Sequence, residues 1–266
     1  MTTNVELPGR RLEDPVSNVL KWILLVVAVA CFAALGWTTE LTYREAPPYP
    51  DRFVAADGTL VMSAADILAG KAGFQKADLM DYGSLYGMGS YFGEDYTAAH
   101  LVRLATLIEE GIAETKIGKA LADLTAEERA SVQAAMQVEL QSVDLTKPAV
   151  TLPKALADAI TTLRAEIAQS LLRHDFAKGW TQAYSLDQKS AAQTANFLIY
   201  SSLTTVARRP GTNASWTQNW PYEPLVGNTP TTSTFRWTWI SFCFTFFAFG
   251  AVLFIYERYL NDPDDG

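Results

Sequence analysis

Two uninterrupted apolar runs dominate the pattern of hydrophobic and polar positions along the chain. Residues 22–37 and residues 237–256 contain no charged side chain, and tryptophan or tyrosine stands at the ends of both runs. A bilayer core about 30 Å thick needs roughly 20 helical residues. The second run has that length, and the first reaches it with a few flanking residues. Aromatic residues at both ends are typical of membrane interfaces. The pattern therefore predicts transmembrane helices over residues 19–39 and 234–256.

Basic residues near the N-terminus set the expected orientation of these helices. Arg10 and Arg11 precede the first run, and positive side chains favour the cytoplasmic side of a membrane. We therefore expect cytoplasmic tails at residues 1–18 and 257–266, with an extracytoplasmic domain at residues 40–233. A cleaved signal peptide is the alternative for the first run, although its apolar stretch is longer than the usual 7 to 15 or so residues.

Between the two runs, apolar residues recur at the spacing of three and four that indicates helices. Ser63 and Thr125 each begin a pattern in which an acidic residue follows three positions later, as in helix capping boxes. Prolines within residues 40–56 predict an extended exit from the membrane, and residues 59–62 give a weak strand signal. We otherwise expect almost no strand, and hence a mainly α-helical domain. The expected helices begin near residues 63, 97, 125, 153 and 187.

Composition offers this chain little chemistry of its own. The formal net charge of −8 argues against a nucleic-acid partner. The two cysteines, Cys31 and Cys243, lie inside the apolar runs, so the expected domain has no disulfide. We expect the two histidines, His100 and His174, to be surface or hydrogen-bonded residues. No set of residues for nucleophilic catalysis, phosphate binding or zinc binding is present.

The segment LMDYGSLYGMGSYFGEDY, residues 79–96, is the most informative motif. A c-type haem needs Cys-x-x-Cys-His. In the cytochrome c subunit of bacterial nitric oxide reductases, that motif runs into a Gly-x-Gly-x-Tyr-Phe turn. Here the turn is present at residues 87–92, but Leu79 and Tyr82 stand at the cysteine positions and Gly83 at the histidine position. The chain thus resembles the N-terminal region of quinol-dependent nitric oxide reductases, a cytochrome c-like domain without haem.

Two further segments, residues 42–50 and 209–231, resemble the same family in the same order. The resemblance implies a non-catalytic membrane subunit in the bacterial inner membrane, with its large domain in the periplasm. It would cap a haem-bearing catalytic subunit that reduces NO to N2O, and would help to shape the quinol site. Haem b and non-haem iron are expected in that partner, because two histidines cannot supply about six ligands.

The resemblance also implies a metal contact, although no cofactor is expected to belong to this chain alone. In the cytochrome c-dependent relatives, the turn helps to bind calcium where the two subunits meet. Matching by motif, Gly89 would contribute its carbonyl oxygen and Tyr91 its side chain. Calcium accepts such oxygen ligands. In the alternative interpretation, Tyr91 and Phe92 only pack the turn.

Two other functions remain open from the sequence. Related membrane enzymes with the same accessory domain could disproportionate NO or reduce oxygen, and the deciding residues would lie in the partner subunit. A two-span receptor or assembly factor would need a cytoplasmic signalling module, which the short acidic tail does not offer. In the family this region is usually fused to the catalytic part. We therefore expect either an enzyme split into two chains or a fragment.

Overall fold

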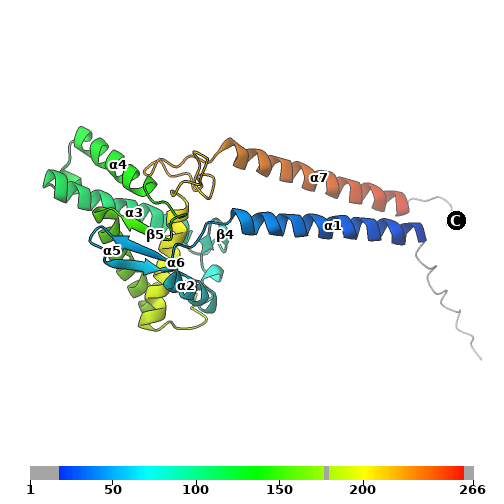
Figure 1. Ribbon diagram of the computed structural model, residues 1–266. Coiled ribbons are helices and arrows are strands. Elements are labelled where there is room, and N and C mark those ends of the chain that lie inside the picture. The colour runs from blue at the N-terminus through cyan, green and yellow to red at the C-terminus, as the bar shows by residue number, and fades with distance from the viewer. Residues whose placement is uncertain (1–17, 177–179, 261–266) are drawn as a thin grey trace, which may run out of the picture. The chain divides into compact units, whose positions relative to one another are not determined.

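The computed structural model describes residues 18–176 and 180–260, and the chain divides into two compact units, residues 1–46 and 47–266 (Figure 1). The first unit holds the helix α1 (Asn18–Glu45). The second holds the folded domain and, at its end, the helix α7 (Thr232–Leu260). The predicted tails lie mostly outside the described residues, as do Arg10 and Arg11, so the orientation stays a prediction.

Helices α1 and α7 are each long and apolar enough to cross a membrane, over residues 21–45 and 232–255. Their described side chains are mostly exposed, which is how a helix with a lipid-facing surface presents its apolar residues. Helix α1 continues six residues beyond the predicted end at residue 39, so the expected extended exit from residue 40 was wrong. The helix ends at Glu45 because the first proline of the segment is Pro47.

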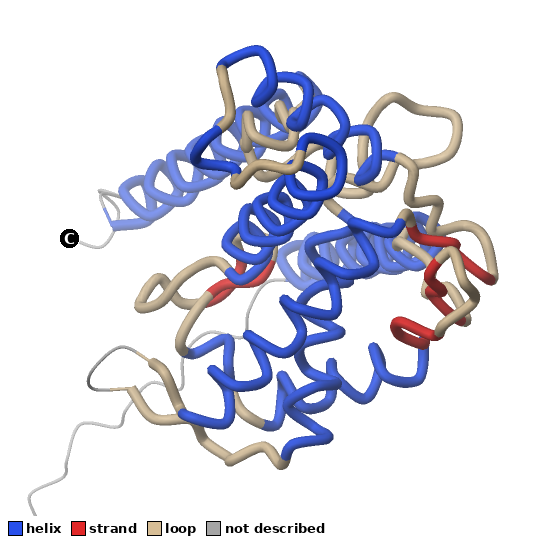
Figure 2. Tube along the Cα trace, turned by 90° about the vertical axis from the view of Figure 1, so that its left-hand side faces the viewer, coloured by secondary structure: helices blue, strands red, loops and turns tan. Residues whose placement is uncertain are grey.

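Helices make up most of the folded domain, which confirms the predicted mainly α class (Figure 2). Its core is formed by α2 (Ala64–Lys76), α3 (Tyr96–Ile112), α5 (Lys154–Arg173) and α6 (Gln188–Thr204). Helix α6 is central. It contacts α2, α3 and α5, and residues 194–204 are buried without interruption. A helix covered on all sides needs few charges, and α6 has one charged residue, near its start.

Close approach of α2 to α6 depends on two glycines. A Cβ atom at Gly70 would collide with the backbone carbonyl of Gln193, and one at Gly73 would collide with the side-chain oxygen of Thr194. Without side chains at these positions, the two helices can pack at short distance. The helix pair α2 and α6 therefore forms the tightest part of the core.

The predicted helix starts are close to those observed, because capping residues mark them. Ser63 caps α2, and Thr125 forms a complete capping box at the start of α4 (Ala126–Gln141). Asp187 caps α6 through its side chain, so the helix begins next to the predicted position. The start of α3 is one residue earlier than expected, because Asp95 rather than Thr97 is the cap.

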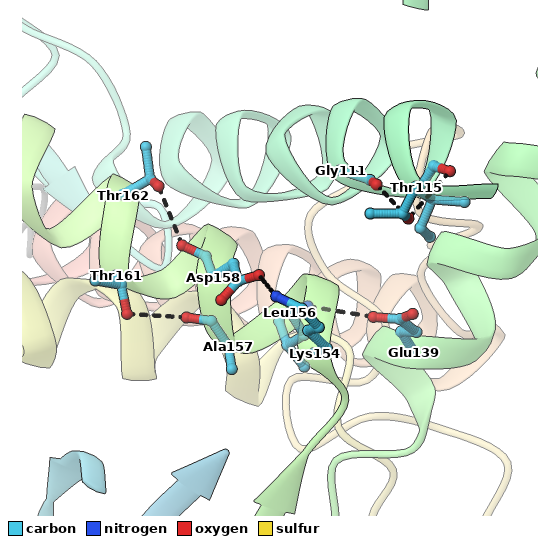
Figure 3. A network of polar contacts seen from close by, with 10 residues as sticks. Gly111, Thr115, Glu139, Lys154, Leu156, Ala157, Asp158, Thr161 and Thr162 are labelled. Atoms are coloured by element: carbon cyan, nitrogen blue, oxygen red, sulfur yellow. Dashed lines mark hydrogen bonds and ion pairs between the residues drawn. The ribbon is translucent and has the colours of Figure 1, made fainter. Parts of the chain in front are cut away.

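Helix α5 begins without a side-chain cap from Pro153, and α4 supplies one instead (Figure 3). The carboxylate of Glu139 accepts a hydrogen bond from the backbone N–H of Leu156, at 3.2 Å. A negative charge at a helix N-terminus also complements the helix dipole. In the first turn of α5, Lys154 donates to Asp158 at 2.6 Å. The junction between α4 and α5 is thus fixed by one half-buried carboxylate.

The weak strand signal at residues 59–62 is confirmed by β2 (Leu60–Ser63), but the other strands were not predicted. Strands β1 (Arg52–Ala55), β2 and β5 (Ala149–Leu152) form a sheet in the order β2–β1–β5, antiparallel and then parallel. Phe53 pairs with both Met62 and Val150, and all three side chains are buried. Two shorter strands, β3 (Ser84–Leu85) and β4 (Met88–Gly89), form a hairpin. Segments of four residues or fewer give too little alternation to be recognised.

Candidate functional site: the turn at residues 79–96

A single carboxylate organises the turn that the sequence singled out. Asp95, the cap of α3, accepts hydrogen bonds from the Ser84 hydroxyl at 2.7 Å and from the Gly87 backbone N–H at 2.8 Å. Its second oxygen accepts from the backbone N–H of Ala98 at 2.9 Å. Charge-assisted bonds of this kind are stronger than neutral ones. Asp95 therefore ties the β3–β4 hairpin to the first turn of α3.

The tip of the hairpin is fastened to the core by Tyr86. Its backbone has a left-handed φ of 55°, and its hydroxyl lies 3.0 Å from the hydroxyl of Thr204 on α6. Burial raises the pKa of this phenol, which keeps it a hydrogen-bonding neutral group. Gly87 follows with φ of 74°, and a Cβ atom there would lie 3.2 Å from the ring of Trp220. Trp220 thus packs against the tip.

The three positions of the haem motif are closed by the chain itself. Leu79, in the short helix η1 (Leu79–Asp81), is fully buried, and its carbonyl accepts from the Tyr96 hydroxyl at 3.1 Å. The ring of Tyr82 lies 5.0 Å from those of Phe176 and Trp180. Gly83 is buried, and a Cβ atom there would collide with the carbonyl of Glu94. A histidine at position 83 could not be accommodated in this backbone.

The proposed calcium ligands lie on an exposed part of the turn. Gly89 is exposed, with φ of 132°, and the side chain of Tyr91 is 87% exposed. The alternative interpretation required both Tyr91 and Phe92 to pack the turn. Tyr91 does not, whereas the Phe92 ring lies 6.0 Å from the Tyr82 ring between centroids. Within the described ranges no group of three or more His, Cys, Asp or Glu could hold a metal. The calcium site stays a prediction that needs ligands from a partner.

His100 differs from its prediction as a surface or hydrogen-bonded residue. Its Nδ1 is enclosed and has no hydrogen-bond partner among the residues described, and its ring stacks on Tyr96 at 6.1 Å. Burial lowers the pKa of His100 to about 4, while the negative charge of Asp95 opposes the change. His100 is therefore neutral at pH 7. His174 is exposed and ends α5 in a left-handed conformation.

Sequence analysis missed a small pocket next to the turn, of about 190 Å³, which His100 lines together with Tyr82 and Tyr96. Its other walls come from α5, α6 and residues 175–176. No local pattern connects these segments. The only hint in the sequence is a histidine on the otherwise apolar face of α3.

The family comparison falls on the same part of the chain. Residues 50–222 match the family described as the cytochrome c-like domain of NorB, a nitric oxide reductase protein. The chain belongs to this family. The match covers most of the chain and includes the whole turn. No curated protein matches the sequence.

Membership of this family confirms the cytochrome c-like resemblance that the turn predicted. It also connects the chain with the NorB component of nitric oxide reductase, and so with a membrane-bound enzyme complex. The two apolar helices, α1 and α7, agree with a membrane protein. Inside this family domain, Leu79, Tyr82 and Gly83 offer neither a thiol nor an imidazole to a haem.

Proposed function

We propose that this chain is the haem-free, non-catalytic part of a quinol-dependent nitric oxide reductase, and that it caps the haem-bearing catalytic subunit. The observation that carries the proposal is the closed haem motif inside a cytochrome c-like domain of the NorB family. Neither a thioether link nor an axial imidazole can form at residues 79, 82 and 83, where Leu, Tyr and Gly stand.

The ligand chemistry of the reaction must then belong to the partner subunit. Haem b and non-haem iron together need about six histidines, and this chain has two. His100 has its Nδ1 enclosed, and His174 lies at the exposed end of α5. The chain thus contributes shape and contacts to the enzyme.

The electron donor follows from the same reasoning. A working cytochrome c subunit passes electrons through its own haem, and the cytochrome c-like domain proposed here has no residues to hold one. Electrons must enter the partner by another route, and a lipid-soluble quinol next to the membrane helices supplies it. The apolar runs at residues 22–37 and 237–256 contain no carboxylate, lysine or histidine for a proton or electron relay. We therefore assign α1 and α7 to anchoring and to shaping the quinol site.

The proposed location is the bacterial inner membrane, with the folded domain in the periplasm and both termini in the cytoplasm. It rests on the basic residues before the first apolar run. The proposed calcium at the contact with the partner rests on the exposure of Gly89 and Tyr91, which leaves both free to face another protein.

The test uses the chain purified from its native membranes together with whatever binds it. We expect b-type haem in the visible spectrum of the complex, and a blank covalent-haem stain on the denatured band of this chain. The complex should consume NO with a quinol analogue and not with reduced cytochrome c. Comparable turnover with reduced cytochrome c in quinone-free detergent would overturn the proposal. Consumption of oxygen in place of NO would assign the complex to a related oxygen-reducing enzyme.

A further inference from the structure

The pocket next to the closed haem motif has the shape of a small-molecule site. Its volume of about 190 Å³ is roughly six times the volume of one liquid water. Three aromatic side chains, those of Tyr82, Tyr96 and Phe176, contribute to its walls, and Ile167 and Leu198 add aliphatic surface. Such a space suits a compact ligand with an apolar body.

The charges that line this pocket are all negative. Glu94 stands at its mouth as an exposed residue, and desolvation of its carboxyl group together with the charge of Asp95 raises the pKa of Glu94. Among the described residues, the hydrogen bond found at Glu94 is the one its backbone carbonyl accepts from Ser84. The other carboxylate, Asp175, is already paired with Arg173 at 2.8 Å. No lysine or arginine is among the lining residues described, so an anion would be repelled.

The imidazole of His100 cannot neutralise the charge of Glu94. His100 lines the pocket and is uncharged at pH 7, because its pKa is about 4. A metal ion is a poor match, because the described residues hold no group of three or more suitable ligands. A cation with an apolar surface suits this lining, because its charge would be attracted both by Glu94 and by aromatic rings.

We propose that this pocket binds a small organic ammonium ion, held by the rings of Tyr82, Tyr96 and Phe176 and by the carboxylate of Glu94. The proposed calcium ligands, Gly89 and Tyr91, are not among the residues that line this pocket. The ammonium site does not rest on the proposed function, because every residue it uses is in the folded domain of this chain.

The two histidines provide the measurement. We would label the full chain at histidine, keep it in detergent micelles at pH 7, and follow the two imidazole signals by NMR during a titration with tetramethylammonium chloride. Sodium chloride at equal ionic strength is the reference. The signal of His100 should move and saturate, while that of His174 should not move. tert-Butanol, which has nearly the same shape without the charge, should leave both signals unchanged at the same concentrations.

Two variants and a control locate the site. Glu94→Gln removes the charge with almost no change in volume and should weaken tetramethylammonium binding about tenfold, equivalent to about 1.4 kcal/mol. Ser170→Leu narrows the pocket from α5 and should abolish the His100 shift. Gln169→Leu, on the exposed side of the same helix, should bind like the unmodified chain.

Three outcomes would overturn the proposal. Equal shifts at His100 and His174 would mean non-specific binding. Saturable binding of tert-butanol with the same affinity would mean a pocket for neutral ligands. Unchanged binding in both Glu94→Gln and Ser170→Leu would place the ammonium elsewhere. The Ser170→Leu result still decides the matter if Glu94→Gln does not fold. Because no readout depends on NO turnover, failure here is distinguishable from failure of the proposed function.

Discussion

The buried imidazole of His100 should make the folded domain lose stability in mild acid. In the folded chain its pKa is about 4, against an ordinary value of 6.5. The folded state therefore binds the proton less readily than the unfolded state. The sign follows: stability is fully present above pH 6.5, and it is lost as the pH falls toward 4, because the unfolded chain takes up a proton that the folded chain refuses.

The size of the effect follows from the same two values. Each pH unit between them changes the free energy of unfolding by about 1.4 kcal/mol, so His100 should account for about 3 kcal/mol between pH 6.5 and pH 4. The acidic groups around it are Glu94, Asp95 and Asp175, with the phenol of Tyr96 stacked on the ring. The raised pKa of Glu94 works in the opposite direction, since its folded form takes up a proton first.

The assay compares the unmodified chain with His100→Phe, which keeps an aromatic ring next to Tyr96 and removes the titrating group. Denaturant unfolding in micelles, followed by tryptophan fluorescence, gives the free energy of unfolding at pH 7 and pH 4.5. Glu94 is present in both chains, so the difference isolates His100. We expect the unmodified chain to lose about 2–3 kcal/mol more than His100→Phe. His174→Asn, at an exposed left-handed position that asparagine tolerates, should keep the full acid sensitivity. An identical pH dependence in all three chains would refute the reasoning.

Three further changes test the junction between α4 and α5, the haem-motif position Gly83, and the exposed turn residue Tyr91. Glu139→Ala removes the cap at Leu156 and should lower the free energy of unfolding by about 1 kcal/mol, whereas Glu127→Ala, an exposed change on the same helix, should have a much smaller effect in the same denaturation assay. Gly83→His should destabilise by about 2 kcal/mol or more because the new side chain meets backbone, and the covalent-haem stain should stay blank because Leu79 and Tyr82 offer no thiol. Tyr91→Phe should leave thermal unfolding unchanged, because the ring is exposed, but should weaken co-purification with the partner or abolish its sensitivity to a calcium chelator; unchanged assembly, calcium content and activity would leave Tyr91 without a metal role.

Helix positions in this chain were predictable because their determinants are local. Ser63 and Thr125 are N-caps whose side chains bond to the backbone three residues later, and a helix follows each of them. Of the sheet, only β2 gave a signal in the sequence, and its other two strands were not predictable for the opposite reason. Strand β1 pairs in parallel with β5, which begins about a hundred residues later, and neither has more than four residues. The stability of such a strand comes from its partners rather than from its own pattern.

The candidate site shows the same division between local and distant determinants. The prediction that residues 79, 82 and 83 hold no haem depends on residue identity alone, so it could be made from the sequence. The enclosure of His100 could not, because the groups around it come from α3, the turn and the end of α5. The sequence does not show whether a histidine in a helix faces water or packs against a tyrosine ring. Its low pKa is a property of the tertiary structure alone.

A cytochrome c-like domain that lacks the residues to hold a haem must have another source of order around the vacated motif, and the aromatic side chains provide it. Tyr82 stands where the resemblance places a haem-motif cysteine, and it packs edge-on against Phe176 and Phe92. Gly93 allows this, since a Cβ atom there would run into the Tyr82 ring. The loop after α5 is thereby held against the turn that Asp95 organises. Selection for a fixed turn with an exposed tip can persist after the loss of electron transfer, provided that the turn still serves as a contact. That is the role the proposed function gives it, and Tyr91→Phe tests it directly.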